Sequence, residues 1–195
     1  MNKQNAIAAA AASALTAGAV GASGAQPEAA QIIGWYHAVL RDADGAVIRE
    51  DRYPNLVTTV GKNFLLDNGL AGSAYTAAFF LGLISSTTFT AVAVADTMAL
   101  HAGWVEAGLA MAPAYSETTR RAAAWSAAAA GSKAFSAGVV ITFTSAGTVK
   151  GSFLTTVSTK DGTTGTLYSA GLFSGGDQPV VNTNTLTVTY TATLT

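Results

Sequence analysis

Apolar and polar positions alternate most regularly at the end of the chain. From Thr185 to Leu194, apolar side chains occupy every second position and threonines fill the positions between them. A period of two places the two sets on opposite faces of a β-strand, and the β-branched threonine favours that conformation. The segment therefore predicts a strand with one face on a core and the other in water or against another molecule.

Strand-like segments also recur earlier in the chain. Residues 35–40 and 46–53 flank the turn sequence Asp42-Ala43-Asp44-Gly45, and Pro54-Asn55 follows the second segment, so the pair predicts a β-hairpin. Residues 77–84 are continuously apolar, as in a strand that is covered on both faces. Further segments of strand length and composition are 104–107, 121–126, 139–144, 148–156 and 167–173.

One segment has the spacing of a helix. Thr58 or Thr59 can cap its start, and Val60, Phe64 and Leu65 follow one helical face. Asn68-Gly69 is a suitable left-handed terminus. The pattern predicts one short helix over about residues 58–68.

These elements define a fold class. About eight or nine strands and one helix in one chain segment predict an all-β fold, an antiparallel β-sandwich of the jelly-roll type, with residues 34–195 as a single domain. Residues 85–102, rich in threonine and alanine, receive no assignment. The chain has no long internal repeat, which disfavours propellers and solenoids.

The first 33 residues differ from the rest. Alanine occupies 13 of the first 30 positions, and the layout is that of a secretory signal peptide with cleavage after Ala25. The stretch is weakly hydrophobic and interrupted by glycine, so we expect it to be retained as an Ala-rich arm that docks on a partner surface. Its larger apolar side chains, Ile7, Leu15 and Val20, are the expected contacts.

Composition narrows the function classes. The formal net charge is −1 and only 11% of residues are charged, so no basic field attracts nucleic acid or an anionic membrane. The chain has no cysteine, which removes disulfides, thiol catalysis and thiolate metal sites. Nucleic acid and membranes are therefore not expected as partners.

Few residues have the chemistry of a catalytic or metal centre. Asp42 and Asp44 resemble the start of a calcium loop, but Ala46 stands where the next ligand belongs, so the segment is interpreted as a turn. A zinc site at His101 would need further ligands, and the sequence offers only carboxylates for that role. A serine hydrolase triad could use His101 and Asp96, but the chain has no G-x-S-x-G elbow. We predict that the protein is not an enzyme and has no cofactor or metal.

Two other groups of residues can make contacts. Arg120-Arg121 is the only basic doublet; it is too small to bind nucleic acid and is expected to meet acidic groups of a protein neighbour. Trp35, Trp104 and Trp125 can serve either as a stacking platform for sugars or as buried core residues, and burial is the commoner role in a sandwich.

Short motifs of turn and strand residues are spread over residues 34–195: Asn55-Leu56-Val57, Gly61-Lys62-Asn63, Leu65-Leu66-Asp67, Asp96-Thr97-Met98, His101 to Glu106, Gly151 to Thr155, Gly162 to Ser169, Gly176-Asp177 and Leu186 to Tyr190. Together these motifs resemble those of small virion proteins of tailed bacteriophages, a group that includes capsid cement (decoration) proteins. The Ala-rich arm lies outside this resemblance.

The resemblance implies a function and partners. It implies a jelly-roll sandwich on the outer surface of an icosahedral capsid that clamps neighbouring major capsid protein subunits, without catalytic residues. The expected partners are the phage major capsid protein and further copies of the chain, as a dimer or trimer, with contacts through edge strands, loops and the arm. The alternatives are a phage tail or fibre component and a carbohydrate-binding β-sandwich, including a secreted lectin-like module if cleavage follows Ala25.

Overall fold

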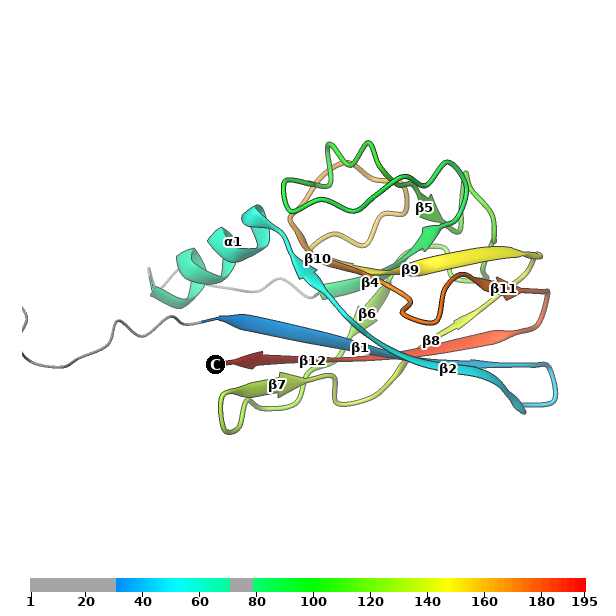
Figure 1. Ribbon diagram of the computed structural model, residues 1–195, viewed down its shortest axis with the longest axis horizontal. Coiled ribbons are helices and arrows are strands. Elements are labelled where there is room, and N and C mark those ends of the chain that lie inside the picture. Colours follow the sequence, from blue (N-terminus) through cyan, green and yellow to red (C-terminus); the bar gives the residue numbers. More distant parts are fainter. Residues whose placement is uncertain (1–30, 71–78) are drawn as a thin grey trace, which may run out of the picture. The chain divides into compact units, whose positions relative to one another are not determined.

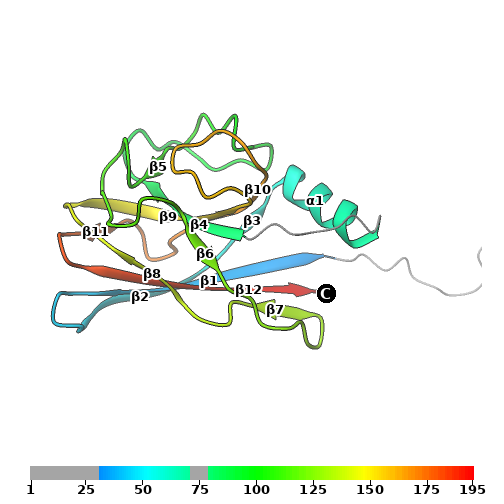
Figure 2. The same ribbon diagram turned by 180° about the vertical axis from the view of Figure 1, so that it is seen from behind.

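A computed structural model describes residues 31–70 and 79–195 (Figure 1). Two antiparallel sheets and one helix make up this part of the chain, which confirms the all-β sandwich. Figures 1 and 2 show β1, β2 and β12 in one layer and β4, β9 and β10 in the other. The jelly-roll connectivity stays a prediction.

The first sheet, sheet A, contains five strands in the order β2-β1-β12-β7, with β8 also paired to β12. Its strands are β1 (Ile32–Arg41), β2 (Val47–Pro54), β7 (Ser132–Ala134), β8 (Val139–Thr142) and β12 (Thr185–Leu194). The predicted hairpin is β1 and β2, and the predicted terminal strand is β12, which pairs with β1 along its whole length. Leu186, Val188 and Tyr190 are buried, as the alternation predicts.

The second sheet, sheet B, contains seven strands in the order β3-β10-β9-β4-β5, with β11 paired to β9 and β6 to β4. Its strands are β3 (Leu56–Val57), β4 (Phe79–Ser85), β5 (Glu106–Ala107), β6 (Arg121–Ala123), β9 (Gly147–Thr155), β10 (Leu167–Leu172) and β11 (Gln178–Val180). As predicted, the apolar run forms an interior strand, β4, whose part before Phe79 lies outside the described residues.

Several strand boundaries differ from the expectation. Strands β3, β7 and β11 are two or three residues long, too short to show a period, and were not predicted. Strand β6 ends at Ala123 instead of residue 126. Residues 86–105 form turns, in which the amides of Thr90 and Ala91 donate to the Gly103 carbonyl at 2.7 and 3.1 Å.

The Asp42 side chain bonds to two backbone amides of the hairpin turn. Asp42 Oδ1 accepts hydrogen bonds from the amides of Asp44 and Ala46, at 3.0 and 2.8 Å. Gly45 adopts a φ of 84°, which glycine tolerates without strain. Because the carboxylate is used by its own backbone, the structure confirms a turn at this place.

The helix α1 (Thr59–Leu70) begins where the cap predicts and ends later than expected. Thr58 Oγ1 accepts from the Gly61 amide at 3.0 Å, which is N-cap geometry. The predicted left-handed end at Asn68-Gly69 is wrong: Gly69 remains helical, and Asn68 Nδ2 donates back to the Phe64 carbonyl at 2.7 Å. Among the described residues, no helix is long and apolar enough to cross a membrane.

Candidate partner-binding face

The outer face of sheet A is an exposed and weakly charged surface, here called the threonine face. Its centre is the column of partly exposed threonines on β12. The register places β1 side chains beside them, with Trp35 opposite Thr191 and His37 opposite Thr189. The residues that define it here are Ile33, Trp35, His37 and Val39 of β1, Glu50, Arg52 and Pro54 of β2, Val140 of β8, and Thr185, Thr187, Thr189, Thr191 and Thr193 of β12.

Two pairs of side chains are in contact on the threonine face. The Arg52 guanidinium lies over the Trp35 indole, 5.0 Å from the ring centroid. His37 Nε2 donates to Glu50 Oε1 at 2.8 Å. Trp35 keeps 38% of its surface exposed. The face therefore combines one large aromatic side chain, a guanidinium over its ring, and a histidine–carboxylate hydrogen bond.

A tyrosine cluster fixes the sheet beneath this face. Tyr36 stacks on Tyr53 at 5.3 Å between ring centroids and lies 4.8 Å from Tyr190. The hydroxyls of Tyr36 and Tyr53 bond to Ser169 and Ser152 of sheet B, at 2.9 and 2.8 Å. Burial raises the pKa of all three phenols, so they stay protonated. These bonds tie the two sheets together, and the threonine face is consequently a rigid surface.

The loop 174–177 covers the free edge of β2. Ser174 Oγ donates to the Arg52 carbonyl at 3.1 Å, and the Gly175 amide donates to Asp51 Oδ2 at 3.0 Å. Arg49 Nη1 donates to the Asp177 carbonyl at 2.9 Å. A partner strand would have to displace this loop before it could pair with β2.

The opposite edge of sheet A is covered as well. The Ser116 amide donates to the Thr142 carbonyl of β8 at 2.9 Å, and the Ser126 amide donates to the Ala134 carbonyl of β7 at 3.0 Å. These bonds occupy one backbone carbonyl of β8 and one of β7, and contacts between edge strands and a partner stay a prediction.

The two arginines that were expected to contact a protein neighbour, Arg120 and Arg121, differ in burial. Arg120 is 1% exposed and pairs with Glu106 inside the same chain. The expectation for Arg120 is therefore corrected: its charge is neutralised internally. Arg121, the first residue of β6, is exposed and can still contact a partner. The arm residues expected to make contacts lie outside the described residues: Ile7, Leu15 and Val20.

His101 and Asp96 both contact Trp104. The Trp104 Nε1 donates to Asp96 Oδ2 at 2.9 Å, and the His101 ring stacks on the indole with centroids 4.0 Å apart. His101 Nδ1 lies 2.9 Å from the Trp104 carbonyl oxygen. Within residues 31–70 and 79–195, no group of three or more His, Asp or Glu side chains is placed to hold a metal ion.

Lys160 is a buried cation that sequence reasoning missed. Its Nζ donates to the Gly108 carbonyl at 3.1 Å and lies 3.4 Å from the centroid of the Tyr115 ring. Burial lowers the pKa of Lys160, and the nearby Glu117 carboxylate opposes that effect. Because its ammonium bonds to backbone carbonyls, Lys160 ties two loops together. A lysine in a turn carries no sequence signal for such burial.

No family model, curated protein sequence or solved structure matches the chain.

Proposed function

We propose that the protein is a non-enzymatic component of a phage particle that binds the outer surface of the capsid and stabilises contacts between major capsid protein subunits. The resemblance of its motifs to capsid cement proteins supports this function, and jelly-roll connectivity belongs to the same proposal. The observation that carries it is the threonine face: an exposed sheet surface, with sheet A tied to sheet B beneath it by the tyrosine–serine hydrogen bonds.

The chemistry of the threonine face suits a protein partner. Burial of a threonine hydroxyl costs far less free energy than burial of an unpaired lysine or glutamate. Tryptophan and arginine are enriched among the residues that dominate binding energy at interfaces. Trp35 with Arg52 is the expected centre of the contact, and the threonines around it exclude water.

Repetition strengthens such a contact. A capsid presents the same surface many times, so an oligomer of the chain that engages several sites gains avidity without new contacts. Each single contact can then be weak. We include a homo-oligomer in the proposal for this reason.

The tail or fibre role and the carbohydrate-binding role are less well supported. Trp104 is 1% exposed and unavailable to a sugar. Trp125 packs edge to face on Phe79 and Phe135, at 5.8 and 4.9 Å between centroids. Trp35 is exposed, but the Arg52 guanidinium already lies over its ring. A sugar would have to displace Arg52 before it could stack there.

The test is binding of the purified full chain to mature capsids that lack it, measured by co-sedimentation and located by electron microscopy. Trp35→Ala should weaken binding about tenfold or more, because it removes the central contact. Thr189→Lys should weaken binding to a similar extent, because it buries a charge in the interface. Leu100→Ala is the matched control, since Leu100 is 71% exposed and lies away from the face.

Three results would contradict the proposal. The first is that the wild type does not bind capsids at all, and the second is that its density lies on the tail instead of the shell. The third result is an equal capsid affinity of Trp35→Ala, Thr189→Lys and the control Leu100→Ala. Deletion of residues 1–30 tests the expected contribution of the arm separately. Undiminished capsid binding and capsid stability after that deletion would remove the arm from the mechanism and leave the threonine face as the contact.

A further inference from the structure

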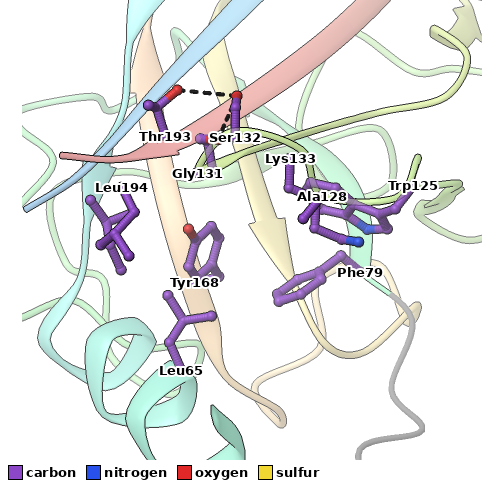
Figure 3. Close-up of a pocket in the computed structure, with 12 residues that line it drawn as sticks. Leu65, Phe79, Trp125, Ala128, Gly131, Ser132, Lys133, Tyr168, Thr193 and Leu194 are labelled. Carbon is purple, nitrogen blue, oxygen red and sulfur yellow. Dashed lines mark hydrogen bonds between the residues drawn. The ribbon is translucent and has the colours of Figure 1, made fainter.

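An apolar cavity of about 460 Å³ opens between the two sheets at the end near α1. Figure 3 shows Leu65 of α1, Phe79 of β4 and Tyr168 of β10 around it, with Leu194 of β12 on a further side. Pockets of about 300–1,000 Å³ are the size that holds small-molecule ligands. Size and lining together fit a small apolar molecule.

One wall of the cavity differs from the others. Trp125 Nε1 is buried and has no hydrogen-bond partner in the described part of the chain. Lys133 lines the same wall, with its Nζ 6.0 Å from the centroid of the Trp125 ring. Among the described lining residues, Lys133 is the one that carries a charge. A buried donor without a partner destabilises the folded protein, and an acceptor on a ligand would satisfy it.

We propose that this cavity binds a small amphiphilic carboxylate, an aliphatic chain or ring with one acid group. Its apolar part lies against Leu65, Phe79 and Tyr168. Its carboxylate accepts hydrogen bonds from Trp125 Nε1 and the Lys133 ammonium, which pairs a cation with an anion at the edge of an apolar site. This binding is independent of the capsid function.

The ligand series separates charge from apolar burial. Decanoate, decanol and decyltrimethylammonium share one chain and differ in the head group, so isothermal titration of the full chain below the micelle concentration compares them directly. Decanoate should bind at least about tenfold more tightly than decyltrimethylammonium, with decanol between them. Equal affinities for the acid and the ammonium ligand would overturn the proposal, as would no decanoate binding.

Variants locate the site. Lys133→Gln should weaken decanoate binding about tenfold and leave decanol unchanged, because only the acid uses the ammonium. Lys62→Gln, in an exposed position of α1 outside the cavity lining, is the matched control and should change neither. Ala128→Trp should abolish binding of all three ligands, because the indole fills the cavity from an exposed position on its lining.

Thermal unfolding of each variant shows whether the fold is kept. A folded Ala128→Trp variant that still binds decanoate would place the site elsewhere and overturn the assignment. Capsid binding by the Lys133→Gln and Ala128→Trp variants should equal that of the wild type, so the two proposals can fail separately.

Discussion

Arg120 and Glu106 form a two-pronged ion pair in the interior of the chain. Arg120 Nε donates to Glu106 Oε1 at 2.9 Å, and Nη2 donates to Oε2 at 2.7 Å. Arg120 Nη1 reaches the Val157 carbonyl at 2.9 Å, and the Asp161 amide donates to Glu106 Oε2 at 2.7 Å. Three chain segments are thus joined by one pair of charges.

Removal of one partner should be costly. Arg120→Ala leaves a buried carboxylate without its counter-charge, and we expect a loss of about 3–5 kcal/mol in the free energy of unfolding, measured by urea denaturation. Lys150→Ala is the control: it removes the partly exposed pair with Asp177 and should cost less than about 1 kcal/mol. Equal losses in the two variants would show that the buried pair has no special role.

Two glycines of α1 should respond in opposite directions to alanine. A Cβ at Gly61 would lie 2.3 Å from the Tyr168 carbonyl oxygen, so Gly61→Ala should destabilise the protein, by about 1–3 kcal/mol, although alanine favours helices. At Gly69 such a Cβ would meet no atom within 4 Å from the described residues outside its own helix, and Gly69→Ala should stabilise by up to about 1 kcal/mol. Thermal unfolding of both variants checks this; a stable Gly61→Ala protein would contradict the packing of α1 on β10.

Alkaline pH should unfold the protein through its buried tyrosines. Burial raises the pKa of Tyr36, Tyr53 and Tyr190 above the ordinary value of 10.0, so the native state keeps protons that the unfolded state loses. Their contribution to stability is complete below pH 10 and falls as the pH rises further, by about 1.4 kcal/mol per pH unit for each phenol. The measurement is the free energy of unfolding at several pH values from 9 to 12, and its change per pH unit is compared with this expectation.

Tyr53→Phe serves as the control for this titration. It removes one phenol and the bond to Ser152, so the protein should be less stable at neutral pH. Above pH 10, the free energy of unfolding should decrease less steeply with pH, by the contribution of one titrating phenol. Lys160 acts with the opposite sign, because its lowered pKa makes stability rise with pH below its ordinary value of 10.5. A stability that does not change above pH 10 would contradict the burial of the tyrosines.

Asp96 should be needed for the loop around Trp104. Its Oδ2 accepts from Trp104 Nε1 at 2.9 Å and from the Ala93 amide at 2.8 Å. Asp96→Ala leaves the buried indole donor without a partner, and we expect a loss of about 1–3 kcal/mol with increased amide exchange across residues 86–105. Asp96→Asn keeps an acceptor oxygen and should lose less; equal losses would mean that the indole bond is unimportant.

The sequence by itself determined the elements whose signal is local. The alternation from Thr185 to Leu194 is a property of neighbouring residues, and it correctly separates the buried face of β12 from the threonine face. The hairpin turn at Asp42 and the helix start at Thr58 are equally local, because each side chain bonds to amides two to four residues away.

Only the tertiary structure decided where the charged residues lie and where the short strands form. Arg120 and Arg121 are alike in sequence, yet one is buried against Glu106 and the other is exposed, because the fold brings distant carbonyls and a carboxylate to one of them. Strand β3 exists because β10 supplies its hydrogen-bond partners. Such contacts join residues far apart in the chain, and no period or spacing within a segment encodes them.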